Sequence, residues 1–170
     1  MIPANVRPGD FGLTTISGGV GKAIRFGQWL NGDGFANYEH AFVYVDNGNI
    51  VEAEPGGARF TPLHYDNVMW SSGLIAVPDH QRFALVQAAM SYVGIPYSEL
   101  DYFSLAAKRL RLPVAGLDAY IASTGHMICS QLVAACYRDA GIPLFKCWTG
   151  DVTPGDLWQL LNTKRGHYGA

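Results

Sequence analysis

The 170-residue sequence has few charged side chains and no run of one sign. Charged residues make up 15% of the chain, and 12 Lys and Arg against 14 Asp and Glu give a formal net charge of −2. Proteins that bind nucleic acid or an anionic membrane mainly through charge carry a basic face or run. The composition therefore predicts neither as the main partner, and a hydrophobic content of 49% excludes a disordered chain.

Long apolar segments are also missing. No run reaches the roughly 18 residues of a membrane span, and the first ten residues lack the basic start and apolar stretch of a secretory signal. We therefore expect a protein that is made in the cytosol and has no stable membrane insertion.

Cysteine is scarce, and a complete nucleotide-binding loop is absent. Cys129, Cys136 and Cys147 form no C-x-x-C pair of the zinc-binding type. The glycine-rich segment 18–23 departs from a phosphate-binding loop, because Ile16 stands at the position of the first glycine and Ala23 at that of the hydroxyl. We expect reduced thiols and neither a metal nor another cofactor, with Cys136 and Cys147 in structural roles.

The hydrophobic pattern changes character near residue 78 of what we predict to be one domain, 1–170. The sheet part, about 1–78, has expected strands at 10–14, 40–45, 50–54 and 73–77, the middle two forming a hairpin around Asn47-Gly48. The helical part, about 79–163, has expected helices at 79–94, 100–110, 129–141 and 154–161, followed by a loose tail from Lys164 to Ala170. Strands followed by helices are typical of the α+β class.

The helix expected after residue 78 has two defining signals. Asp79 is the predicted N-cap. Apolar residues follow at helical spacing, and they form the predicted apolar stripe of this helix: Phe83, Val86, Met90 and Val93.

Cys129 stands where an extended run turns into the third expected helix. There the positive end of the helix dipole favours the thiolate. Leu132, Val133 and Cys136 share its face of the helix, so Cys129 is expected to point toward the sheet. A free cysteine on such a face is commonly a small buried hydrophobic residue. Catalysis therefore requires a base nearby.

A cysteine nucleophile needs a base and a third polar group that orients the base. Among the five histidines, His40 is the best candidate, because it begins a strand that we expect in the centre of the sheet. The other histidines are expected in solvated positions: His64, His80, His126 and His167.

The returning strand of the hairpin offers two carboxylates, Glu52 and Glu54. A two-residue turn would pair Tyr44 with Val51 and place Glu52 on the opposite face from His40. A three-residue loop with a bulge would pair Tyr44 with Glu52 and place its carboxylate on the face of His40. A bulged hairpin is therefore predicted. Because side chains alternate between the two faces of a strand, Glu52 and Glu54 share a face, and this parity argument does not separate them. If Glu54 is not the orienting group, it is expected to be an exposed edge carboxylate.

Four segments together resemble the motifs of NlpC-type papain-like cysteine peptidases. They are the cysteine-helix motif at 128–133 with Gly-Ile-Pro-Leu at 141–144, the histidine-strand motif at 40–45 with Glu52 twelve positions later, Arg-Pro-Gly-Asp-Phe at 7–11, and Gly-Ile-Pro-Tyr at 94–97. In this chain His40 precedes Cys129, which is the order of the circularly permuted branch that includes YiiX-like hydrolases and the lecithin:retinol acyltransferase group.

The resemblance implies a circularly permuted papain-like fold, in which a central antiparallel sheet packs against the helix bearing the cysteine. It implies a triad of Cys129, His40 and Glu52, and so selects Glu52 over Glu54. It also suggests that the Tyr97 hydroxyl assists the Cys129 backbone amide in binding an oxyanion, although Tyr97 is equally compatible with simple aromatic packing. Phe42, which stands in place of a small family residue, is expected to narrow the cleft or move the hairpin.

The implied activity is hydrolysis of an amide bond in a peptide, an isopeptide or a cell-wall peptide. A cell-wall substrate would require delivery in a phage particle or by a secretion system. The residues around Cys129 lack the Asn-Cys-Glu-His sequence of the acyltransferase group, which makes lipid acyl transfer a weaker prediction. Thiol acyl transfer or deamidation by the same triad stays open, as does a non-catalytic binding or structural module such as a virion component.

Overall fold

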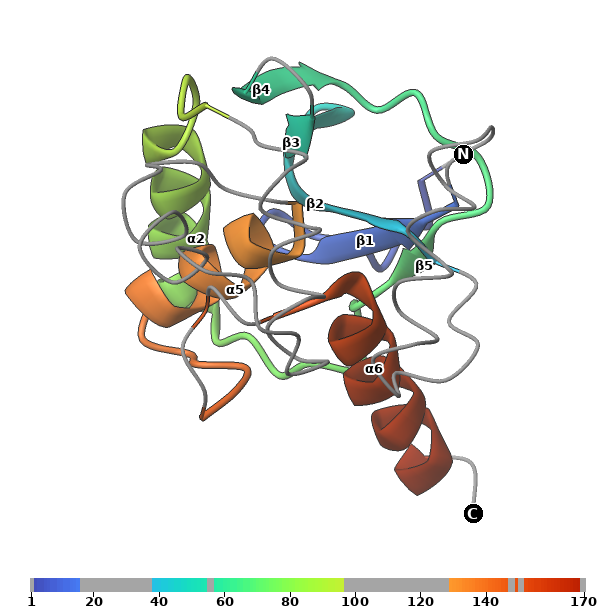
Figure 1. The fold of residues 1–170 in the computed structure, drawn as a ribbon. Coiled ribbons are helices and arrows are strands. Elements are labelled where there is room, and N and C mark those ends of the chain that lie inside the picture. The colour runs from blue at the N-terminus through green and yellow to red at the C-terminus, as the bar shows by residue number, and fades with distance from the viewer. Residues whose placement is uncertain are drawn as a thin grey trace, which may run out of the picture.

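The computed structural model describes residues 2–15, 38–54, 57–96, 129–146, 149 and 152–168. Within these ranges a five-stranded antiparallel sheet, in the order β4-β3-β2-β1-β5, is combined with three helices (Figure 1). The strands are β1 (Phe11–Thr14), β2 (His40–Asp46), β3 (Asn49–Glu54), β4 (Gly57–Pro62) and β5 (Met69–Trp70), and the helices are α2 (Asp79–Ser91), α5 (Cys129–Asp139) and α6 (Pro154–Tyr168). The predicted α+β class is confirmed.

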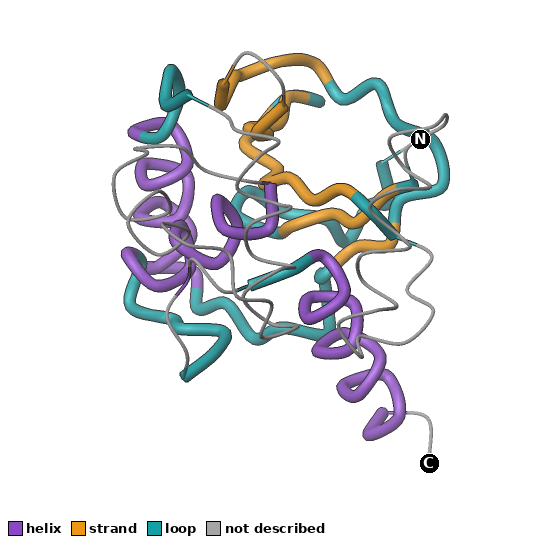
Figure 2. The backbone as a smooth tube through the Cα atoms, viewed as in Figure 1, coloured by secondary structure: helices purple, strands orange, loops and turns teal. Residues whose placement is uncertain are grey.

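The two faces of β2 contribute to two different clusters of buried side chains. Ala41, Val43 and Val45 belong to the main core, which the sheet forms with α2, α5 and α6 (Figures 1 and 2). Phe42 and Tyr44 alternate with them and belong to a smaller cluster. Because α5 packs on β2 and β3, this helix brings its first turn to the sheet.

Helix α5 is buried along most of its length. The Tyr137 hydroxyl donates to the carbonyl oxygen of Gly9 at 2.9 Å, and the Ser130 hydroxyl donates to that of Val152 at 2.7 Å. These two hydrogen bonds fix both ends of the helix against neighbouring segments. Cys129 is 3% exposed and belongs to the main core, as its predicted orientation toward the sheet requires.

The turn of the β2–β3 hairpin is shorter than predicted. Asn47 and Gly48 have φ values of 50° and 80° and form a two-residue turn of the type that Asn-Gly favours, closed by the pair Asp46 and Asn49. The predicted three-residue loop and the pair of Tyr44 with Glu52 are therefore wrong.

The predicted bulge is confirmed, but it lies in β2. The register shifts between Tyr44 and Asp46, so that Tyr44 faces Ile50 and Phe42 faces Glu52. Val45 is the extra residue. Its insertion returns Glu52 to the face of the sheet that carries the alternate residues of β2, beginning with His40.

The apolar stripe predicted for α2 is wrong. Phe83, Met90 and Val93 are 73%, 40% and 39% exposed, whereas Leu85 and Ala89 are fully buried. The helix packs against α5 and buries the face with Leu85 and Ala89. Of the predicted stripe only Val86 is partly buried against the main core, and the other three residues point toward solvent.

The predicted N-cap of α2 is also wrong. The N-cap is Pro78, without a side-chain hydrogen bond, and Asp79 lies in the first turn. Its carboxylate forms an exposed ion pair with Arg7 at 2.6 Å. The acidic side chain therefore assists the helix start through charge rather than as a cap.

Two further segments differ from the prediction. The segment 73–77 forms a turn, in which the amides of Leu74 and Ile75 both donate to the carbonyl oxygen of Ser71, and the edge strand is β5 instead. Helix α6 continues to Tyr168, so most of the tail predicted to be loose is helical.

The helix expected at 100–110 lies outside the described residues. No helix in the described part of the chain combines the length and apolar character needed to cross a membrane.

Candidate active site

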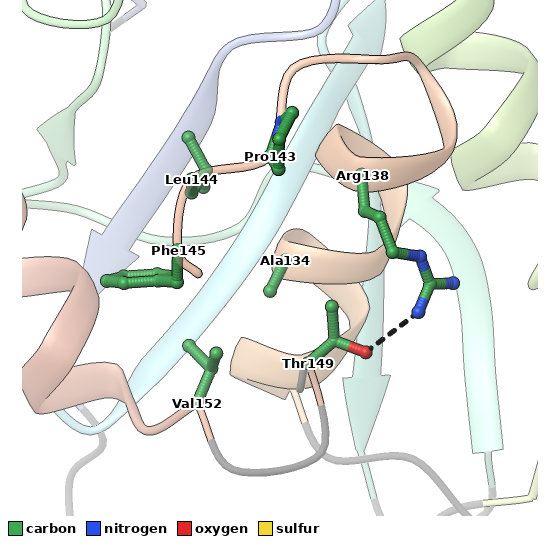
Figure 3. Close-up of a pocket in the computed structure, with 7 residues that line it drawn as sticks. All are labelled: Ala134, Arg138, Pro143, Leu144, Phe145, Thr149 and Val152. Atoms are coloured by element: carbon green, nitrogen blue, oxygen red, sulfur yellow. Dashed lines mark hydrogen bonds between the residues drawn. The ribbon is translucent and has the colours of Figure 1, made fainter. Parts of the chain in front are cut away.

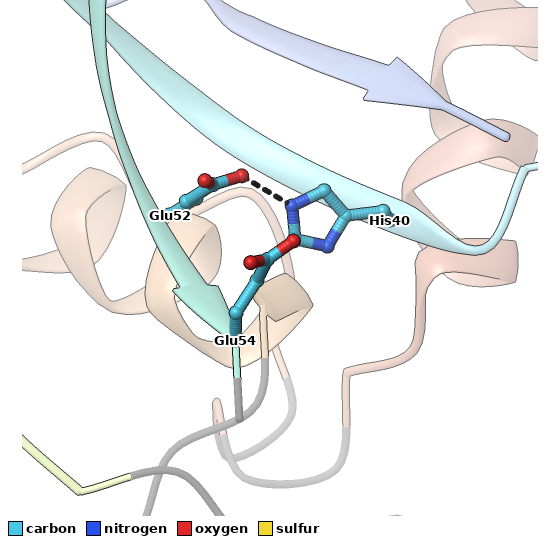
Figure 4. A group of neighbouring side chains, drawn as sticks. All are labelled: His40, Glu52 and Glu54. Carbon is cyan, nitrogen blue, oxygen red and sulfur yellow. Dashed lines mark hydrogen bonds and ion pairs between the residues drawn. The ribbon is translucent and has the colours of Figure 1, made fainter. Parts of the chain in front are cut away.

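The hairpin brings an imidazole and a carboxylate together in a buried position (Figure 4). His40 is 2% exposed and Glu52 is fully buried, and His40 Nε2 lies 2.8 Å from Glu52 Oε2. An ionised carboxylate only accepts hydrogen bonds, so Nε2 carries the proton in this contact. Nδ1 is then the ring nitrogen that can serve a second partner.

Cys129 lies in the first turn of α5, near this imidazole. Its Sγ lies 4.0 Å from the carbonyl oxygen of Glu39, the residue before His40. Interaction with Cys129 contributes to the raised pKa of His40. The β2–β3 hairpin and the distant helix α5 thus bring Cys129, His40 and Glu52 into one cluster.

The charges of this cluster stabilise one another against burial. Burial by itself lowers the pKa of His40, but hydrogen bonds and charge interactions with Cys129 and Glu52 outweigh it and raise the pKa to about 10. Burial likewise raises the pKa of Glu52, but hydrogen bonds from His40, Tyr65 and Arg59 lower it to about 2. At neutral pH the site therefore holds an imidazolium beside a carboxylate.

Arg59 and Tyr65 also contact Glu52, and neither was predicted as a site residue. Arg59 lies directly opposite Glu52 on β4 and donates to Oε1 through Nε at 3.0 Å and Nη2 at 2.8 Å. Tyr65, in the segment after β4, donates to Oε2 at 2.7 Å. The sequence Pro-Gly-Gly at 55–57 is a signal for a second hairpin and could have revealed Arg59, whereas no comparable signal marks Tyr65.

Glu54 is part of the same cluster, contrary to its prediction as an exposed edge carboxylate. Its side chain is 29% exposed, its Oε1 lies 2.9 Å from the Tyr65 hydroxyl, and its Oε2 forms an ion pair with Arg59. His40, Glu52 and Glu54 offer possible metal-ligand atoms within 4.8 Å of one another. The Arg59 guanidinium already supplies the positive charge that pairs with both carboxylates, so the arrangement favours an ion-pair cluster over a metal site.

Phe42 occupies the second cluster of buried residues rather than the space beside Cys129. Its ring stacks on Tyr65, with centroids 5.5 Å apart and planes inclined by 15°, and meets Trp70 edge-on. Gly12 pairs with Phe42 across β1 and β2, and a Cβ at Gly12 would lie 2.5 Å from the Phe42 ring. The large side chain is accommodated because its neighbour has none.

Gly12→Ala should therefore destabilise the protein by about 1–3 kcal/mol, the usual cost of overpacking a buried site. The added methyl group would contact both Phe42 and Val68 at less than van der Waals distance. Urea denaturation measures this effect. Adding Phe42→Leu to Gly12→Ala should cost less than the sum of the two single changes, and strict additivity would contradict the proposed clash.

Several predicted residues lie elsewhere. His64 and His80 are exposed, as predicted, and Cys136 is fully buried, where burial raises its pKa above the usual thiol range. The described ranges do not include Tyr97, His126, Cys147 and the run before Cys129. The role of Tyr97 stays a prediction.

A separate small pocket lies at the opposite end of α5 (Figure 3). Arg138 donates to the Thr149 hydroxyl at 3.1 Å at one side of it, and the rest of its lining is apolar. It is lined by Ala134, Arg138, Pro143, Leu144, Phe145, Thr149 and Val152. Since neither His40 nor Cys129 contributes to this lining, the pocket is distinct from the candidate active site.

Comparison with known proteins identifies no family for this chain. No model of a known protein family matches the chain, and no curated protein matches it. The arrangement of Cys129, His40 and Glu52 is therefore the main basis for a functional proposal.

Proposed function

We propose that this protein is a thiol hydrolase that cleaves an amide bond in a peptide, an isopeptide or a cell-wall peptide. Cys129 is the nucleophile, His40 is the general acid and base, and Glu52 orients His40. The observation that carries the proposal is the buried imidazole of His40, held by the Glu52 carboxylate at 2.8 Å, with Cys129 near enough to raise the pKa of His40. The resemblance to the circularly permuted papain-like branch supports the proposal. His40 precedes Cys129 in the sequence, and the sheet that carries His40 packs against the helix that begins at Cys129.

The mechanism follows from the two nitrogens of His40. With Nε2 fixed by Glu52 and the imidazole protonated at neutral pH, Nδ1 already holds the proton taken from Cys129, and the Cys129 thiolate attacks the substrate carbonyl. His40 then gives this proton to the leaving amine as the C–N bond breaks, which leaves a thioester on Cys129. A water molecule then gives a proton to His40 as it attacks the thioester. The C–S bond breaks and the acid product leaves, which restores the Cys129 thiolate beside protonated His40.

The oxyanion of the tetrahedral intermediates needs donors as well. We assign the Cys129 backbone amide and the Tyr97 hydroxyl to this role. The loss of one such donor typically costs about 3 kcal/mol of transition-state stabilisation.

The reactivity of Cys129 tests the proposal without knowledge of the substrate. Iodoacetamide should alkylate Cys129 faster than free cysteine at neutral pH, because His40 assists formation of the thiolate. Peptide mapping by mass spectrometry follows each thiol separately. Cys136 serves as an internal reference that should react slowly, because its pKa is raised and His40 is the partner of Cys129.

His40→Ala is the control for this measurement, since it keeps Cys129 in place and removes its base. The rate should fall by about tenfold or more. A Cys129 that reacts no faster than free cysteine, or equally fast with and without His40, would leave the non-catalytic binding or structural module as the better explanation.

Product analysis separates hydrolysis from the two alternatives that use the same triad. With p-nitrophenyl acetate as probe, a hydrolase releases acetate. A thiol acyltransferase instead moves the acetyl group to an added primary amine, and a deamidase releases ammonia from glutamine peptides.

A further inference from the structure

The Glu52 carboxylate receives two hydrogen bonds on each oxygen. Arg59 donates twice to Oε1, at 3.0 and 2.8 Å, while His40 and Tyr65 approach Oε2 at 2.8 and 2.7 Å. The carboxylate is fully buried. A second rotamer would break charge-assisted hydrogen bonds to several donors at once.

Tyr65 is itself held from two sides. Its ring stacks on Phe42, which lies opposite Glu52 in the sheet, and its hydroxyl lies 2.7 Å from Glu52 and 2.9 Å from Glu54. A phenol has one proton, so at any moment it donates to only one of these two carboxylates. Arg59 pairs with both carboxylates and reduces the repulsion between them.

We propose that Arg59 and Tyr65 are positioning residues, which hold Glu52 ionised and in one orientation toward His40. Glu54 assists by binding both the Tyr65 hydroxyl and the Arg59 guanidinium. The inference rests on the proposed function, in which Glu52 orients the base. Without these two donors a carboxylate in this buried position is free to rotate or to take up a proton, and Nε2 of His40 then loses its acceptor.

The electrostatics of the surrounding elements support this assignment. Three elements surround the Glu52 carboxylate: His40 comes from β2, Arg59 from β4 and Tyr65 from the segment after β4. Glu54 lies on the same strand as Glu52, and Cys129 of α5 interacts with His40. Burial raises the pKa of Glu52, but the donors His40, Tyr65 and Arg59 lower it to about 2. Removing one donor should raise the pKa toward its ordinary value.

Tyr65→Phe tests the inference because it keeps the ring on Phe42 and removes only the hydroxyl. Carbon-13 NMR of the carboxyl groups should show the Glu52 pKa about one unit higher, as expected for one lost hydrogen bond to a charged group. Cys129 alkylation should then decline at a higher pH than in the wild type as the solution is acidified, because protonated Glu52 no longer holds His40.

Tyr44→Phe is the matched control. It removes a hydroxyl from the same face of the sheet, where Tyr44 accepts a hydrogen bond from the Gly48 amide at 3.4 Å and does not contact Glu52. The Glu52 pKa and the pH profile of alkylation should both equal those of the wild type.

Arg59→Lys supplies a second measurement. It keeps the inference testable if the Tyr65→Phe protein does not fold. It keeps the charge and loses the two-donor contact, so the Glu52 pKa should again rise. An unchanged Glu52 pKa in the variants would overturn the inference, even in an active hydrolase. A raised pKa in a protein whose Cys129 is unreactive would support the positioning role and contradict the proposed function instead.

Discussion

Cys129→Ala should reduce thiol-dependent hydrolysis of p-nitrophenyl acetate to background and leave the fold nearly intact. The change removes the atom that forms the thioester, so no residual covalent route exists. The side chain is small, and the loss of buried contact should cost about 1 kcal/mol of stability. Initial rates of p-nitrophenol release, together with urea denaturation, measure the two effects separately.

Cys136→Ala is the control, since Cys136 lies on the same helix and is fully buried. Its stability cost should be similar, whereas hydrolysis should persist. The His40 pKa gives a further check, because interactions with Cys129 raise it; it should fall in Cys129→Ala and stay high in Cys136→Ala. Full activity in Cys129→Ala would refute the mechanism.

Glu52→Gln should lower the rate of hydrolysis on the order of 10³- to 10⁴-fold, the scale seen when the acidic member of a catalytic triad becomes an amide. The amide has the shape of the carboxylate but carries N–H groups, and in this site it meets donors from His40, Arg59 and Tyr65. At least one of these donors then faces another donor. The rate at saturating probe concentration and the NMR titration of His40 measure the loss.

Glu54→Gln makes the same chemical change two residues along the strand. Glu54 contacts Tyr65 and Arg59, whereas the hydrogen bond of His40 goes to Glu52. The rate should therefore fall by less than about tenfold, the loss expected for an indirect contact of hydrogen-bond strength. A larger loss for Glu54→Gln than for Glu52→Gln would assign the orienting role to Glu54.

The hairpin shows which parts of the site the sequence could predict. The face on which Glu52 must lie follows from the alternation of a strand, and the parity argument correctly required a bulge. The position of the bulge did not follow, because Asn47-Gly48 suits a two-residue turn and an extra residue in either strand restores the same parity. The prediction placed the extra residue in the loop, whereas Val45 carries it in β2.

The contacts of Arg59 and Tyr65 show what local patterns could not predict. Arg59 reaches Glu52 through the pairing of β3 with β4, and β4 was missing from the predicted elements. Tyr65 depends on stacking with Phe42, which involves residues distant in the sequence. The exposed Phe83 of α2 has a related cause, because helical spacing reveals a stripe but does not determine which face meets a neighbour.

The bulge at Val45 makes the site depend on chain length as much as on residue identity. A substitution between His40 and Glu52 alters one contact, whereas the gain or loss of one residue exchanges the faces of every residue beyond it. Such a change would turn Glu52 into the apolar core and leave His40 without its acceptor. In the evolution of this hairpin, length changes in steps of one should therefore be far rarer than substitutions, and paired changes that restore the count should be the tolerated kind.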